Sequence, residues 1–536
     1  MLAQAGLRSS AQRAWRMTLG DFCYTFSPPI AWCNRFMSLA LERLIAGTPI
    51  PFAGNRVTVV SPELAARFAP GDHLLVEQVS GELLLIPVAD QHAAAVAIER
   101  AQAAFSAMSA VSDQAISTFF DVFAQRLETP ECWALIEAAN LADIERAKAR
   151  GRSTTRLLAD ERMRRDMIAG LRAWRDASAT RGKVLSCVEH DGWKVEQVVS
   201  PLGIVAFVFE GRPNVFADAA GVLRTGNTAV LRIGSDALGT ARAIVTHALN
   251  PALSDAGLPT GAVSLVDSVN HAAGWAMFAD RRLSLAVARG SGRAVSQLGS
   301  IAQQAGTAVS LHGTGGAWLI ADTDADATRF AAVVRNSLDR KVCNTLNVCL
   351  IHRDRAAELV PLFLDALQQA GKARGQACKL HIVEGSEAYL PADWQTASVE
   401  VYRAEGYRTE ALAEALPEDQ LGREWEWEET PEVSLKIVDD LDSAIALFNR
   451  YSPQFTVSLL SEACATQERF YNAVNAPFVG NGITRWVDGQ YALNKPELGL
   501  SNWESGRLFA RSAILSGDGV FTIRSRMTQV DLGVKR

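Results

Sequence analysis

The sequence predicts an α/β protein built on parallel, doubly wound sheets, and two observations carry this prediction. From residue 202 onward, apolar runs of strand length alternate with segments of helical periodicity, which is the pattern of repeated βα units. The second half of the chain repeats this alternation around a different sheet. With 536 residues, of which 48% are hydrophobic and 21% charged, the chain is long enough for two or three domains with large cores.

The pattern of residues 1–90 predicts a small α+β appendage that precedes these sheets. Ile30–Ile45 has helical periodicity, whereas Arg56–Val60 and Asp72–Pro87 have the pattern of strands, the latter folded at a turn of Ser80 and Gly81. Two roles remain open for this appendage. It either packs against the chain or an oligomer partner, or it recruits a protein that delivers substrate.

Helices and a hairpin are expected before the first sheet. Residues 93–181 are helical in pattern throughout, and two alternating runs flank Asp191-Gly192, which is a strong hairpin signal. Five strands are then expected at Gly203–Phe209, Thr228–Ile233, Ala262–Val266, Leu283–Ala288 and Ala308–Leu311. The helices between and after them are expected at Phe216–Arg224, Ala237–Leu249, His271–Ala279 and Arg293–Ala305. Sheets of this kind bind ligands at the carboxyl ends of their strands.

Fewer elements can be assigned in the second half. The pattern predicts helices at Asp324–Leu338 and Arg355–Ala370 and strands at Val348–Ile351 and Leu435–Val438. Glu424–Glu429 is an acidic loop that carries two tryptophans, and the tail Gly517–Val530 has the pattern of strands that pair with the hairpin.

Composition excludes several classes of function. The formal net charge of -6 implies no general affinity for nucleic acid. The cysteines form no CxxC pair and the histidines show no metal-ligand spacing, which argues against a metal site and a disulfide framework and favours the cytoplasm. No apolar run reaches the length of a membrane span. The basic first twenty residues have no clear cleavage pattern, so we interpret them as an ordinary amphipathic start.

Cys343 is the centre of the most informative stretch, Val342–Asn347. It lies between a polar, basic lead-in (Arg335–Lys341) and the apolar run Val348–Ile351. A thiolate at the mouth of a buried strand can be both reactive and accessible. The same pattern also fits a cysteine that serves as a small core residue.

Two upstream segments, Pro201–Gly221 and Leu223–Asp236, accompany this cysteine. Together the three segments resemble the gamma-glutamyl phosphate reductase (glutamate-5-semialdehyde dehydrogenase) family, a branch of the aldehyde dehydrogenase superfamily. The resemblance runs from about residue 91 to about residue 530 and is most specific at Glu210–Val215 (Glu-Gly-Arg-Pro-Asn-Val). A late stretch, Val479–Gly489, matches a further motif of the family.

The resemblance implies an aldehyde dehydrogenase-like α/β fold with four parts. Residues 1–90 would be the appendage, and residues 91–310 a Rossmann-type cofactor domain whose hairpin, residues 183–200, forms an oligomerisation arm. Residues 311–475 would be the catalytic cysteine domain, and residues 476–536 would return to the cofactor domain and the arm. In the superfamily this arm pairs with another subunit, so a homo-oligomer is expected.

The implied chemistry passes through a thioester. Cys343 would attack an activated acid, and the Asn214 side chain with the Cys343 backbone N–H would hold the oxyanion. Asn214 also fits a simple turn residue after Pro213. Hydrolytic members of the superfamily carry a glutamate base where this chain aligns Leu311, so the thioester should survive to be reduced. The adjacent His312 is either a substitute base or a structural histidine.

The resemblance also implies NADP(H) as cofactor. Arg232 and Ser235 would lie near the adenosine ribose, and no acid immediately follows Arg232-Ile-Gly, which favours NADP over NAD; Asp236 tempers this preference. Gly290, Ser291 and Gly292 open a helix after a strand, where a pyrophosphate could meet helix N–H groups. Glu428 either binds the nicotinamide ribose or is a solvated acid.

For an acyl phosphate, the family resemblance indicates Arg212, Asn336, Asn344, Thr484 and Arg485, with the two arginines suited to bidentate binding of an anion. The chain departs from the family beside this pocket. It has Arg340-Lys341-Val342 where the family has arginine-proline-serine, and Asn347-Val348 where the family has glutamate-threonine. These changes put strict glutamyl-phosphate specificity in question.

The leading interpretation is an NADPH-dependent reductase of an activated carboxylic acid, with gamma-glutamyl phosphate, an intermediate of proline biosynthesis, as the default substrate. A related reductase of another acyl phosphate, or of a carrier-protein or CoA thioester, is the alternative. A catalytically silent scaffold is a third possibility. No kinase or adenylating domain is evident in the sequence, so a separate kinase or carrier protein is expected to activate the acid.

Overall fold

The computed structural model describes residues 40–533, except 153, 155, 156, 210, 404, 405, 487–489, 502, 505, 506 and 509–511. Glu42–Arg536 group into one compact unit. The helix expected at Ile30–Ile45 falls mostly outside the described residues, and its described part, residues 40–45, is not helical. None of the helices among the described residues is long and apolar enough to cross a membrane.

Two small hairpins form the described part of the N-terminal appendage. β1 (Pro49–Phe52) pairs with β2 (Arg56–Val59), and β3 (His73–Val76) pairs with β4 (Leu83–Ile86), with α1 (Pro62–Arg67) between the two hairpins. The predicted turn at Ser80 and Gly81 is confirmed; β1 was not predicted. Gly81 has φ +78°, and a Cβ there would lie 2.4 Å from the Phe52 ring, so glycine lets the hairpins meet.

A five-stranded parallel sheet follows in the order β11-β10-β7-β8-β9. Its strands are β7 (Ile204–Phe209), β8 (Thr228–Ile233), β9 (Val263–Leu265), β10 (Leu283–Arg289) and β11 (Ala308–His312), so all five predicted strands are confirmed. Alternate side chains enter two cores. Phe207 and Leu231 share one core with α3 (Asp113–Glu128) and α5 (Glu161–Asp176), and Ala206 shares the other with α10 (Gly292–Gln304). The sheet is therefore covered on both faces, as doubly wound folds require.

Two of the predicted helices in this part are interrupted. The helix expected at Phe216–Arg224 is divided into α6 (Val215–Ala219) and a 3-10 turn. The helix expected at Ala237–Leu249 begins as α7 (Leu238–Ile244), passes through a π turn and continues as α8 (Asn250–Asp255). Pro251 has no N–H to donate to the preceding turn, and a single π turn inside the helix shifts the hydrogen-bond ladder at this point.

The second half contains a seven-stranded parallel sheet in the order β17-β14-β18-β13-β12-β19-β20. Its strands are β12 (Ala317–Ala321), β13 (Leu346–His352), β14 (Lys379–Val383), β17 (Ala413–Leu416), β18 (Glu432–Val438), β19 (Thr456–Leu460) and β20 (Phe478–Gly480). The helices α11 (Ala327–Asn336), α12 (Ala356–Ala373) and α14 (Leu441–Tyr451) contribute to the same core. The sequence predicted β13, β18, α11 and α12 but not the other strands.

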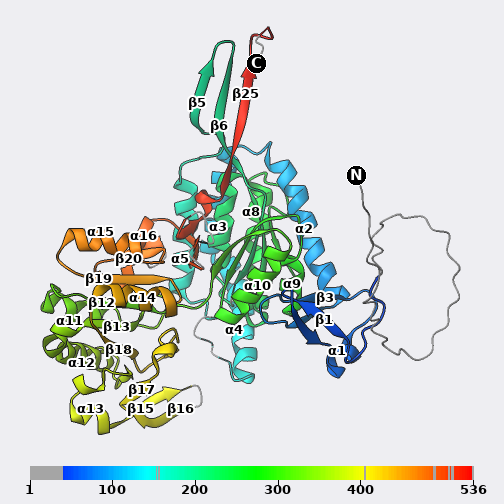
Figure 1. The fold of residues 1–536 in the computed structure, drawn as a ribbon. Coiled ribbons are helices and arrows are strands. Elements are labelled where there is room, and N and C mark those ends of the chain that lie inside the picture. Colours follow the sequence, from blue (N-terminus) through cyan, green and yellow to red (C-terminus); the bar gives the residue numbers. More distant parts are fainter. Residues whose placement is uncertain are drawn as a thin grey trace, which may run out of the picture. The chain divides into compact units, whose positions relative to one another are not determined.

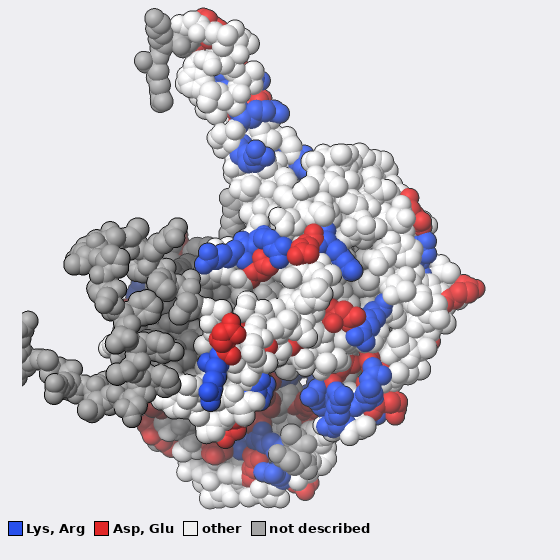
Figure 2. Space-filling model, turned by 90° about the vertical axis from the view of Figure 1, so that its right-hand side faces the viewer, with Lys and Arg blue, Asp and Glu red and all other residues white. Residues whose placement is uncertain are grey.

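An arm of three antiparallel strands projects from the helices in Figure 1. β5 (Val184–His190) and β6 (Trp193–Pro201) form the predicted hairpin, and the tail strand β25 (Phe521–Gln529) pairs with the full length of β6. Val184, Leu185 and Met527 are exposed on it. That a second copy covers these side chains stays a prediction. On the face drawn in Figure 2, basic and acidic side chains are interspersed.

Candidate active site

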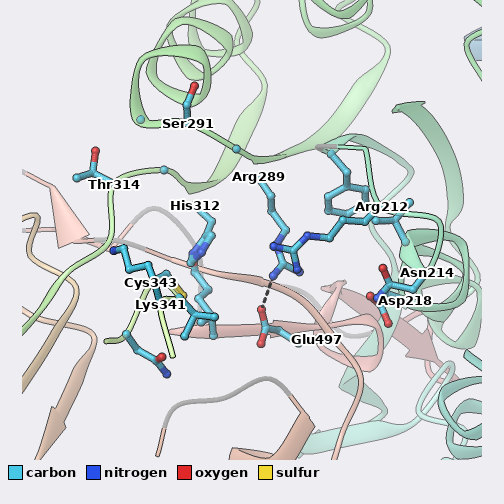
Figure 3. A pocket seen from close by; sticks show the side chains of 18 of the residues that line it. Arg212, Asn214, Asp218, Arg289, Ser291, His312, Thr314, Lys341, Cys343 and Glu497 are labelled. Atoms are coloured by element: carbon cyan, nitrogen blue, oxygen red, sulfur yellow. Dashed lines mark hydrogen bonds and ion pairs between the residues drawn. The ribbon is translucent and has the colours of Figure 1, made fainter. Parts of the chain in front are cut away.

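A cavity of about 720 Å³ lies at the carboxyl ends of β7, β10 and β11, against the loop that precedes β13 (Figure 3). This is the edge of a parallel sheet where ligands are expected. Eight of the residues singled out from the sequence line the cavity: Arg212, Asn214, Gly290, Ser291, Gly292, His312, Cys343 and Asn344. The two halves of the chain thus contribute to one cavity.

Cys343 is held in a tight loop between α11 and β13. Its carbonyl oxygen accepts a hydrogen bond from the Gly316 N–H at 2.7 Å. A Cβ on Gly315 would lie 2.7 Å from the Cys343 Cα, so only glycine allows this close approach. The Cys343 side chain packs against a small cluster that contains Phe455 and Leu500. No described residue accepts a hydrogen bond from the Cys343 backbone N–H.

Burial raises the pKa of the Cys343 thiol to about 11, with Glu497 and Glu424 raising it further and Arg289 and Lys341 lowering it. The resting side chain is therefore a neutral thiol at physiological pH. Because the thiolate is the nucleophilic form, the thiol proton has to leave as the cysteine reacts.

Two ion pairs flank the cysteine, and sequence reasoning missed both. Arg289 Nη2 lies 3.2 Å from Glu497 Oε1, drawn dashed in Figure 3. Lys341 Nζ lies 2.5 Å from Glu424 Oε1, and the second oxygen of Glu424 accepts from the Gly315 N–H at 2.6 Å. Glu424 therefore links the acidic tryptophan loop to the strand end beside Cys343. The pairing partners are too far apart in sequence for spacing to reveal them.

His312 lies inside the cavity as a neutral ring. Burial, reinforced by Arg289, lowers the pKa of His312 to about 3. Its Nδ1 is 2.8 Å from the Leu500 carbonyl oxygen, so Nδ1 carries the proton and Nε2 is an acceptor. Leu311 does not line the cavity. Its side chain faces α10, since a Cβ on Gly299 would lie 2.4 Å from Leu311 Cδ1.

Asn214 and Asp218 lie at the two ends of α6. Asn214 is the N-cap residue, and its Oδ1 is buried without a hydrogen-bond partner among the described residues. Asp218 also lines the cavity, and burial raises the pKa of its carboxyl to about 7, with Arg289 and Arg212 opposing the rise. Asp218 was not singled out from the sequence, although its spacing of four residues from Asn214 on a helix was a usable signal.

The remaining substrate residues expected from the resemblance lie behind the cavity or away from it. Thr484 Oγ1 donates to the Asn344 carbonyl oxygen at 2.8 Å, and Arg485 donates to the Asn344 side chain and to Asp339. Neither lines the cavity, so they support Asn344 from behind. Asn336 is exposed at the end of α11 and does not line the cavity.

The glycine loop lines the first cavity, whereas Arg232 lines neither that cavity nor the one around Ser235 but has donors that a ligand could use. Arg232 ends β8, is only 4% exposed, and its Nε and Nη2 have no hydrogen-bond partner among the described residues. Such an orphaned cation suits a ligand hydroxyl or phosphate. A Cβ on Gly292 would lie 2.2 Å from Thr314 Oγ1, so glycine lets the Thr314 hydroxyl approach the start of α10 closely.

The other expected cofactor residues are less central. Ser235 lines a second cavity of about 590 Å³ together with Arg146 and Arg150. The carboxylate of Asp236, beside it, pairs with Arg150 and Arg152, which reduces its repulsion of a phosphate. Glu428 is exposed and lines neither cavity, whereas Glu424 and Glu426 of the same loop line the first one.

Comparisons with known proteins agree with this arrangement. The model of the aldehyde dehydrogenase family matches residues 78–379. The chain is 31% identical to a gamma-glutamyl phosphate reductase from Allorhizobium ampelinum, over 71% of this chain and 83% of the relative. It is 30% identical to a gamma-glutamyl phosphate reductase from Limosilactobacillus reuteri, over 68% of this chain and 82% of the relative. A crystal structure of gamma-glutamyl phosphate reductase from Thermotoga maritima shares the fold, with a TM-score of 0.71 at 22% identity, covering 83% of this chain and all of that one.

Proposed function

The chain belongs to the aldehyde dehydrogenase family, in the branch of the gamma-glutamyl phosphate reductases, and from that premise we propose that it reduces an activated carboxylic acid to an aldehyde. NADPH is the proposed reductant, a thioester on Cys343 the intermediate, and gamma-glutamyl phosphate the default substrate. One observation carries the proposal: the Cys343 thiol and the Arg212 and Asn214 side chains, from opposite halves of the chain, line the same cavity.

In the first step the Cys343 sulfur adds to the acyl carbon and the carbon–oxygen bond to phosphate breaks. The thiol proton leaves with the phosphate, so the products are a neutral thioester and inorganic phosphate. No described residue accepts a hydrogen bond from the Cys343 N–H. This N–H can therefore donate to the oxyanion that forms on the acyl oxygen. Arg212 and Arg289 supply positive charge for the anionic leaving group.

In the second step the thioester carbon is reduced and the carbon–sulfur bond breaks. When bound, NADPH supplies the hydride for this step. Cys343 leaves as a thiolate and takes a proton, for which its raised pKa of about 11 provides a strong driving force. Leu311 faces α10 rather than the cavity, so that position offers no base to activate water against the thioester.

The chain offers a coherent set of residues for the cofactor. Arg232, with two unpartnered guanidinium nitrogens, would bind the adenosine ribose or its 2′-phosphate. Gly290, Ser291 and Gly292 would admit the pyrophosphate to the N-terminus of α10. Glu424 is a better candidate than Glu428 for the nicotinamide ribose, because Glu424 lines the cavity.

The test is the reverse reaction, because acyl phosphates are short-lived. The purified protein is mixed with glutamate-5-semialdehyde, NADP and phosphate, and the formation of NADPH is followed. We expect phosphate-dependent formation of NADPH. Formation that requires CoA in place of phosphate would favour the thioester reductase instead, and no formation with either acceptor would contradict the proposal. A separate kinase or carrier protein would supply the activated acid.

A further inference from the structure

Most acids around the cavity already have a cationic partner. Glu497 pairs with Arg289, and Glu424 pairs with Lys341. Asp218 is different. The pKa of its carboxyl is set by burial and by the more distant charges of Arg289, Glu497 and Arg212. No hydrogen bond from a described residue contributes to it. The Asp218 side chain is half-buried, and a carboxylate withdrawn from water without a bonded partner is costly unless a ligand supplies one.

Asn214 provides a second, independent acceptor beside this carboxylate. Its Oδ1 is buried without a partner among the described residues, and residues four apart on a helix share a face. Figure 3 shows the Asn214 and Asp218 side chains together, with the Arg289–Glu497 pair between them and Cys343 in this view. The same pair influences the pKa values of both Cys343 and Asp218.

Two adjacent acceptors, one of them anionic, match a ligand cation that carries several N–H donors. We propose that the Asp218 carboxylate, with the Asn214 amide oxygen, binds an ammonium group of the acyl substrate and makes Asp218 a specificity-determining residue. This inference rests on the proposed function, because it names the group by which that site selects its acyl substrate. The default substrate carries such an ammonium on the carbon next to its free carboxylate.

The contact also has a chemical consequence. An unprotonated amine at that position could attack its own acyl group and close a five-membered lactam. An ammonium held by Asp218 has no lone pair with which to do so. Asp218 therefore selects the amino-bearing substrate and keeps its amine unreactive while Cys343 attacks.

The first test compares two aldehydes that differ only in the amino group, glutamate-5-semialdehyde and 5-oxopentanoate, in the reverse reaction with NADP and phosphate. In Asp218→Asn, we expect kcat/KM for the amino aldehyde to fall at least about thirtyfold and that for 5-oxopentanoate by less than about threefold. Asp166→Asn removes one negative charge from an exposed residue of the same cavity and serves as the matched control, with both substrates changed by less than about twofold. Equal losses for both aldehydes in Asp218→Asn would overturn the proposal.

A binding experiment remains informative if neither aldehyde is turned over. The NADPH-loaded protein is titrated calorimetrically with L-glutamate and with glutarate, which lacks the amino group. We expect the wild type to prefer glutamate and Asp218→Asn to lose this preference while its NADPH affinity and melting temperature stay near wild type. A wild type that binds both acids equally would refute the ammonium site, whatever the outcome for the proposed reaction.

The pH dependence of glutamate binding tests whether the ionised Asp218 carboxylate is the form that binds the ammonium group. Arg212, Arg289 and Glu497 are the charged groups whose fields act on Asp218. Because the Asp218 pKa is about 7, its ionised fraction rises roughly tenfold from pH 6 to pH 8, and glutamate affinity should rise with it. Affinity that falls over this range would mean that Asp218 donates a proton to an anion, and would overturn the proposal.

Discussion

Substitutions in the Lys341–Glu424 pair should change the pKa of the Cys343 thiol in opposite directions, depending on which member is replaced. Glu424 raises the pKa of the Cys343 thiol and Lys341 lowers it, and the pair is mostly buried, with side chains 14% and 11% exposed. Glu424→Gln removes the acid and releases the cation, so both effects lower the thiol pKa. Lys341→Met removes the cation and releases the acid, so both effects raise it.

The magnitude follows from elementary electrostatics. One unit charge several ångströms from a partly buried thiol is worth on the order of 1 to 2 kcal/mol at an effective dielectric constant near 20. About 1.4 kcal/mol corresponds to a tenfold change in thiolate fraction. A less basic thiolate is also less nucleophilic, with a Brønsted coefficient of about 0.4 to 0.5, so the alkylation rate should rise only roughly threefold in Glu424→Gln. It should fall by a similar factor in Lys341→Met.

Iodoacetamide alkylation at mildly alkaline pH, quantified by mass spectrometry of the peptide that contains Cys343, measures this rate. Peptide resolution is needed because Cys187 and Cys464 are exposed and also react. The amide that Glu424→Gln introduces would retain an oxygen acceptor for the Gly315 N–H, and circular dichroism checks that both variants are folded. Alkylation that changes in the same direction in both variants would refute the electrostatic reasoning and indicate a change in access instead.

Two further predictions concern the nucleophile and a buried charge cluster. Cys343→Ala should abolish turnover while leaving NADPH affinity within about twofold, measured by fluorescence titration; comparable activity would refute the covalent mechanism. Glu432, 1% exposed, binds His381 at 3.0 Å and Arg403 at 2.5 Å, so Glu432→Gln should lower the free energy of unfolding by about 3 kcal/mol in urea denaturation. A loss below about 1 kcal/mol would mean that Glu410 compensates Arg403 fully.

The first sheet could be predicted because each of its strands is a largely apolar or β-branched run in the sequence. Ile204–Phe209 and Thr228–Ile233 are buried along their whole length, and continuous apolar or β-branched runs are typical of strands covered on both faces. The strand Lys379–Val383 in the second sheet is equally buried but contains Lys379 and His381. Their partners Glu410, Glu414 and Glu432 come from other segments, so the sequence alone gives no reason to bury a lysine there.

The residues of the candidate site also fall into two groups, those that could be predicted from the sequence and those that could not. Residues in compact motifs, such as Arg212 and Asn214 or the segment around Cys343, were found because each motif is continuous in the sequence. Arg289 and Glu497 were missed, because they meet only when β21 (Glu497–Leu500) comes beside β10. Glu428 was singled out through an approximate alignment of a variable loop, and such an alignment cannot tell which glutamate of the loop faces the cavity. The fold decides it, because Glu424 and Glu426 line the cavity and Glu428 does not.

The distribution of acids explains how a thioester can survive in a cavity that contains several carboxylates. Glu424 and Glu497 are each paired with a cation, so neither carboxylate stands free beside the thioester. Asp218, with a pKa of about 7, is the carboxylate best suited to act as a general base near neutral pH. With an ammonium bound to it, that carboxylate is occupied whenever the correct acyl group is on Cys343. The residue that selects the substrate would therefore also protect the thioester from hydrolysis.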